Sequence, residues 1–64
     1  MSIEKEKMKK LIKGAIADLE VTIKEIEESM VHESKSSLFS KLNMRDRLLE
    51  IKKSLEESLN KLYQ

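Results

Sequence analysis

The chain has 64 residues, enough for one small domain with a marginal hydrophobic core. It has no cysteine and one histidine, which excludes disulfides, thiolate metal sites and nitrogen-rich metal clusters. Charged residues make up 39% of the chain and nearly balance, with 13 basic and 12 acidic, a composition typical of long helices and coiled coils.

No run of 18 apolar residues occurs, and the basic N-terminal segment is not followed by the apolar stretch of a signal peptide. We therefore expect a cytoplasmic protein that does not enter a membrane and carries no cofactor.

The first half of the chain predicts a helix over about 3–32. Ser2 suits the N-cap, and acidic residues in the first turns suit the positive end of the helix. Gly14 is compatible with close helix–helix approach, simple tolerance or a hinge. Apolar residues then recur at alternating steps of four and three, which predicts a coiled-coil stripe on one face: Ile12, Ile16, Leu19, Ile23, Ile26 and Met30.

The middle of the chain predicts a bend at about 33–37. Ser34, Ser36 and Ser37 favour caps and turns because serine hydroxyls bond to the neighbouring backbone. A second helix is expected over about 38–62, with an alternative start or restart near Asn43. Its apolar stripe comprises Leu48, Ile51, Leu55, Leu59 and Leu62. Because no proline or glycine interrupts the middle, one unbroken helix of about 95 Å is the alternative.

The charge distribution favours antiparallel contact. Residues 15–33 carry six acids and one lysine, whereas residues 34–53 carry six basic residues and two acids. A bend at 33–37 places these oppositely charged segments side by side. An antiparallel dimer of unbroken helices would pair the same charges.

The apolar stripes are wider than a two-stranded contact requires. Doubled positions such as Leu11/Ile12, Ala15/Ile16 and Leu48/Leu49 predict a second apolar surface. The expected fold is therefore all-α, an antiparallel two-helix hairpin that dimerises into a four-helix bundle.

The sequence favours a binding protein over an enzyme. A two-helix hairpin offers no concave pocket in which His32 or the pairs Glu27-Glu28 and Glu56-Glu57 could do acid–base work. We expect a small non-enzymatic module, acting as an adaptor, inhibitor or chaperone-like regulator on a larger protein. The candidate partner-binding residues lie beside the bend: Leu38, Phe39, Lys41 and Arg45. Two basic segments, 5–13 and 35–53, keep an RNA-binding hairpin dimer as an alternative.

The stretch Ile16-Ala17-Asp18-Leu19-Glu20 through Glu33-Ser34-Lys35-Ser36-Ser37 resembles the coiled-coil hairpin of Gre-factor-like proteins. The resemblance implies a hairpin that enters the secondary channel of RNA polymerase, where acidic residues at its tip assist the active-site metal. Here no carboxylate follows Ser37 until Asp46, so the alternative is a Gre-like regulator that lacks the acidic tip.

Overall fold

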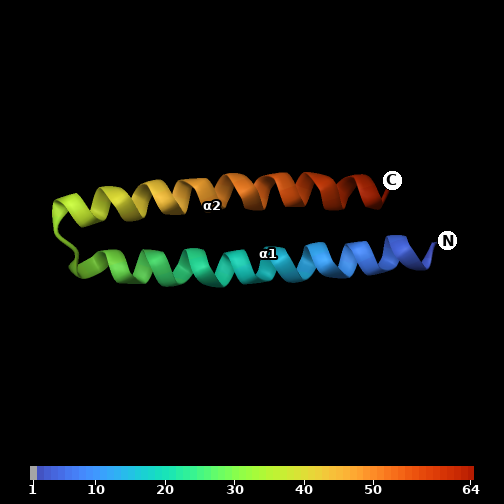
Figure 1. Ribbon diagram of the computed structural model, residues 1–64, viewed down its shortest axis with the longest axis horizontal. Helices are drawn as coiled ribbons and strands as arrows, with labels where there is room; N and C mark the ends of the chain where they lie inside the picture. The colour runs from blue at the N-terminus through green and yellow to red at the C-terminus, as the bar shows by residue number, and fades with distance from the viewer. Residues whose placement is uncertain (1) are drawn as a thin grey trace.

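The computed structural model describes residues 2–64 and consists of two long helices that lie side by side (Figure 1). Helix α1 spans Ile3–Ser29 and helix α2 spans Lys35–Leu62, with a short 3₁₀ helix η1 at Met30–His32 between them. The Cα atoms extend over 51 × 14 × 11 Å, and both termini lie at the same end. The predicted all-α antiparallel hairpin is confirmed, and the alternative of one unbroken helix is wrong.

The bend is shorter than the predicted segment 33–37. Only Glu33 and Ser34 are extended, with ψ angles of 152° and 162°, and Ser34 is the N-cap of α2. Helix α2 therefore begins before the predicted start at 38, and Ser36 and Ser37 form part of its first turn. Serine is tolerated there because the first backbone N–H groups of a helix have no intrahelical acceptor. The helix passes through Asn43 without a restart.

Helix α1 starts where its capping residues predict. The Ser2 hydroxyl accepts a hydrogen bond from the backbone N–H of Lys5 at 3.2 Å, and Glu4 and Glu6 lie in the first turn. Gly14 lies inside the helix, and a Cβ added there would meet no atom within 4 Å. Close helix approach is therefore the wrong explanation for this glycine in the hairpin, and the helix continues through it without a hinge.

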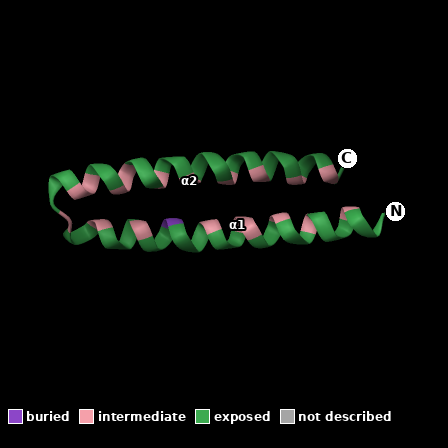
Figure 2. Ribbon diagram, in the orientation of Figure 1, coloured by how far each residue is buried: buried purple, intermediate pink, exposed green. Residues whose placement is uncertain are grey.

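The helices cover only a narrow stripe of each other. Figure 2 shows the half-buried residues along the sides of α1 and α2 that face one another. Within residues 2–64, Ile23 is the only buried residue, and 7% of its surface is still exposed. The six predicted stripe residues of α1, from Ile12 to Met30, all lie on this contact.

Candidate interaction surfaces

The contact on α2 includes three charged residues that an apolar pattern does not reveal. Lys41, Arg45 and Lys52 are half-buried at heptad spacing with the leucines of this helix. Their aliphatic stems cover apolar surface while their charged ends reach its rim. We call the contacting positions the seam, which on α2 comprises Leu38, Lys41, Leu42, Arg45, Leu48, Lys52, Leu55, Leu59 and Leu62. Ile51, expected in this stripe, is 50% exposed and lies outside the seam.

Two ion pairs join the helices along the seam, and a third joins α2 to the bend. Arg45 Nη1 lies 3.5 Å from Glu27 Oε2, and Lys52 Nζ lies 3.5 Å from Glu20 Oε1. Lys41 pairs with Glu33 beside the bend. Moving seven residues along α1, from Glu20 to Glu27, moves the partner seven residues back along α2, so the two helices keep a constant register. The predicted pairing of the acidic part of α1 with the basic part of α2 is confirmed.

These ion pairs occupy two of the four candidate partner-binding residues. Lys41 also donates to the Ser29 hydroxyl at 2.9 Å, and Arg45 Nη2 lies 3.5 Å from Asp46 Oδ1. Their side chains are 27% and 28% exposed, so both hold the hairpin together beside the bend. Leu38 is half-buried, whereas Phe39 is 68% exposed.

The bend end presents two uncovered hydrophobic residues. Val31 lies in η1 and is 73% exposed, and Phe39 lies in the second turn of α2. Val31 precedes the bend in the sequence, and Phe39 follows it. His32 lies next to Val31 and is also exposed.

At the end of the hairpin that carries both termini, lysines of α1 contact the last two residues of the chain. Lys9 Nζ lies 4.4 Å and Lys13 Nζ 5.3 Å from the centroid of the Tyr63 ring, within the range of cation–π attraction. A hydrogen bond and a charge interaction with Tyr63 raise the pKa of Lys13 above its ordinary value of 10.5. Lys5 Nζ also donates to the carbonyl oxygen of Gln64 at 3.5 Å.

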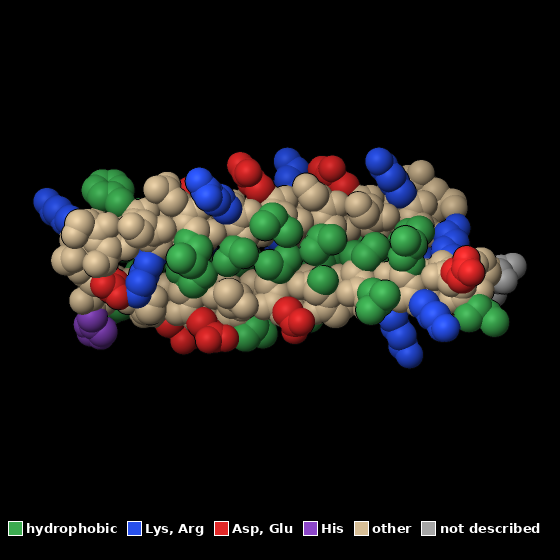
Figure 3. Space-filling model, in the orientation of Figure 1, with side chains coloured by type: hydrophobic (Ala, Val, Ile, Leu, Met, Phe, Trp, Pro, Cys, Tyr) green, Lys and Arg blue, Asp and Glu red, His purple; other side chains and the backbone are tan. Residues whose placement is uncertain are grey.

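One face of the hairpin carries a continuous band of hydrophobic side chains along the line between the helices, with charged side chains at its margins (Figure 3). In an antiparallel pair of helices, the residues just before equivalent seam positions lie on the same face of the pair. We call these residues the uncharged edge, because none of them is ionisable. They are Met8, Ala15, Thr22 and Ser29 on α1, and Ser37, Met44, Ile51 and Ser58 on α2.

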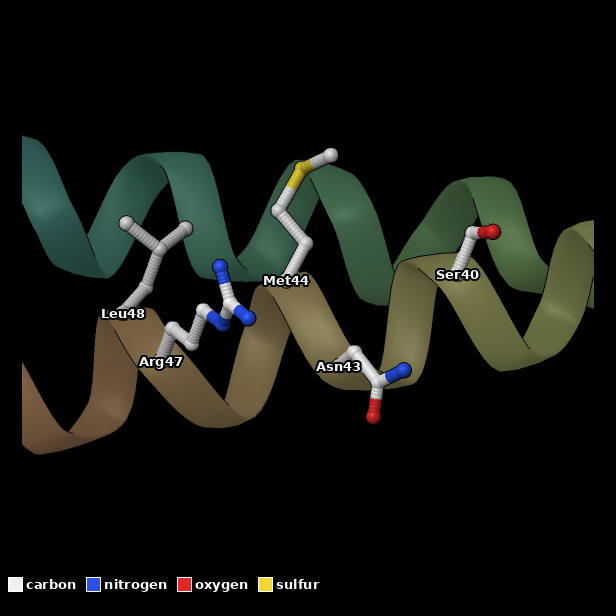
Figure 4. A pocket seen from close by; sticks show the side chains of 5 residues that line it. All are labelled: Ser40, Asn43, Met44, Arg47 and Leu48. Atoms are coloured by element: carbon white, nitrogen blue, oxygen red, sulfur yellow. The ribbon is translucent and has the colours of Figure 1, made fainter.

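Part of this face forms an open depression on α2, lined by Ser40, Asn43, Met44, Arg47 and Leu48. Figure 4 shows Met44 and Leu48 reaching from α2 toward α1. Arg47 is its only charged residue, so this depression holds no pair of groups for acid–base chemistry. Within residues 2–64, no three side chains of the metal-binding types are grouped to hold an ion. None of the helices in this part of the chain has the length and apolar character to cross a bilayer.

Comparison with protein-family models, with curated proteins and with solved structures found no match for this chain.

Proposed function

We propose that this hairpin is a small non-enzymatic interaction module that acts by binding another protein chain. The main support is that the chain contains many hydrophobic residues but buries few of them. Hydrophobic residues make up 39% of the chain, yet within residues 2–64 Ile23 alone is buried. Apolar surface of this extent is stabilised when a partner covers it.

The proposed contact with a larger protein is the bend end. Phe39 and Val31 are exposed there, at the tip of a rod 51 Å long, where a partner reaches them without contacting the rest of the hairpin. Aromatic residues are the most frequent anchors of protein interfaces. Lys41 and Arg45 contribute by holding the bend in shape through their ion pairs.

A capture experiment with the full chain as bait tests this proposal. The wild type, Phe39→Ser and Val21→Ser are immobilised in parallel, exposed to an extract of the native host and analysed by mass spectrometry. Val21 is the matched control, because it is 58% exposed and lies on α1 away from the bend. The expected result is a protein retained by the wild type and Val21→Ser but lost with Phe39→Ser.

Equal retention by all three baits would contradict the proposed position of the site, and retention by none would contradict the proposed function. Capture of RNA polymerase through Phe39 would identify the partner that the Gre-like resemblance implies.

A further inference from the structure

We infer that the uncharged edge binds a second copy of this chain, with both bends at the same end of a four-helix bundle. This inference rests on the proposed function, in which the hairpin acts by binding another protein chain. It specifies the face of the hairpin that is bound, a second copy of the chain as the partner, and the relative direction of the two hairpins.

The uncharged edge is the better contact for a second copy because its own residues carry no charge, unlike those of the opposite edge. The opposite edge consists of the residues that come directly after seam positions in the sequence. It includes Glu20 and Glu27, whose carboxylates form the interhelical ion pairs. The uncharged edge carries no ionisable group, and Met44 and Ile51 on it are half exposed. A second chain would desolvate the carboxylates of two ion pairs on the first edge, whereas on the second it would cover apolar and hydroxyl groups and, near the bend, the Lys41 ammonium that is bonded to Ser29.

The orientation follows first from side-chain size. The register of the ion pairs places Thr22 at about the height of Ile51, and Ser29 at about the height of Met44. With both bends at the same end, α1 of one copy lies against α2 of the other at these same heights. Thr22 then faces Ile51 of the other copy and Ser29 faces Met44, so small residues meet large ones near the bend, the alternation that fills a helical core, whereas Ala15 faces Ser58.

The opposite orientation, with bends at opposite ends, packs each helix against its own copy. Small residues of α1 then face small residues, with Thr22 near Ser29 of the second copy. Large residues of α2 face large ones, with Met44 near Ile51 of the second copy. This arrangement leaves gaps between the α1 helices and crowding between the α2 helices.

The charges beside the uncharged edge favour the same orientation. Just outside the edge, α1 carries Glu4, Asp18 and Glu25 and no lysine or arginine. The equivalent positions of α2 carry Arg47 and Lys61 and no acid. With the bends together, Glu25 lies at the height of Arg47 of the second copy. With the bends apart, the acidic row of α1 faces itself, as does the basic row of α2.

Distances between spin labels test the orientation. Ser34 suits a single Ser34→Cys label because it lies at the bend, is exposed and makes no capping bond with its side chain, and the chain has no other cysteine. With the bends together, the labels of the two copies lie within about 30 Å, since neighbouring helix axes are about 8–10 Å apart. A distance near the 51 Å length of the hairpin would overturn the proposed orientation.

Two matched variants test the face. Ile51→Lys places a charge on the uncharged edge, and Leu49→Lys places the same charge on the opposite side of α2, where Leu49 is 41% exposed. We expect Ile51→Lys to weaken dimerisation at least tenfold and Leu49→Lys to leave it within about threefold, measured by sedimentation equilibrium. The reverse ranking, or a folded wild-type monomer, would overturn the inference. Capture through Phe39 is measured separately, so failure of either proposal is distinguishable from failure of the other.

Discussion

At the scale of single residues, the hairpin combines an apolar contact with charges that fix its direction. Arg45 and Lys52 lie at seam positions where leucine would give more apolar contact, and each pairs with a glutamate of α1. Partly exposed ion pairs contribute little free energy, about 0.2–1 kcal/mol each. Their main effect is on which segments of α1 and α2 lie together, because a slipped register would separate the charges.

The Glu27–Arg45 pair gives the first prediction. In a double-mutant cycle with Glu27→Gln and Arg45→Gln, we expect a coupling energy of up to about 1 kcal/mol that decreases with added salt. Urea unfolding at one fixed chain concentration measures it. A coupling that is zero at low salt would contradict a contribution of this pair to stability.

The contact between Lys13 and Tyr63 gives a prediction about pH. Tyr63 raises the pKa of Lys13 in the folded chain, so the stabilisation is fully present below the unfolded value of about 10.5. It is lost as the pH rises through the higher folded value, so alkaline solution destabilises the open end.

Tyr63→Phe keeps the aromatic ring but removes the hydroxyl. We expect the pKa of Lys13 to return toward 10.5, as followed by NMR titration of its side chain. An unchanged titration in the variant would show that the tyrosine hydroxyl is not the cause of the shift.

At the scale of the helices, Gly14 is a weak point in α1. Its surroundings leave room for a methyl group, and glycine in a helix interior costs about 1 kcal/mol relative to alanine. We expect Gly14→Ala to raise the free energy of unfolding by about 0.5–1 kcal/mol, measured by urea unfolding. A loss of stability would indicate that another chain approaches the helix at this position.

Ile23 is the centre of the contact between α1 and α2. We expect Ile23→Ala to lower the free energy of unfolding by about 2 kcal/mol, at the low end for isoleucine, because a narrow contact collapses easily around a small cavity. Val21→Ala is the control, with an effect within about 0.5 kcal/mol, since Val21 is exposed. Equal effects of the two substitutions would contradict the position of the seam.

The helices and their direction could be predicted from the sequence, because the apolar spacing of α1 and the segregated charges act locally. The sequence predicts the start of α2 at 38, three residues after the observed Lys35, since serine suits a first helical turn as well as a bend. Arg45 and Lys52 were missed as contact residues because an apolar pattern ignores the stems of charged side chains. Their heptad spacing with Leu48 and Leu55 was the available signal. Ile51 is exposed because its neighbour Lys52 occupies the contact position, so its exposure could be predicted only once Lys52 was known to lie in the seam.

At the scale of the whole molecule, the hairpin by itself buries little apolar surface. Two helices bury one stripe each, and a chain of 64 residues without disulfides or a metal-ligand set has few other sources of stability. We therefore propose that association completes the fold, with a second copy covering the uncharged edge and a larger protein binding at the bend.

Mass in solution tests this claim most directly. Light scattering over a concentration series, with helicity followed by circular dichroism, should give twice the chain mass of 7.5 kDa while the chain is helical. On dilution, mass and helicity should fall together. A fully helical chain that remains at 7.5 kDa at every concentration would show that the hairpin is complete by itself and would contradict the account.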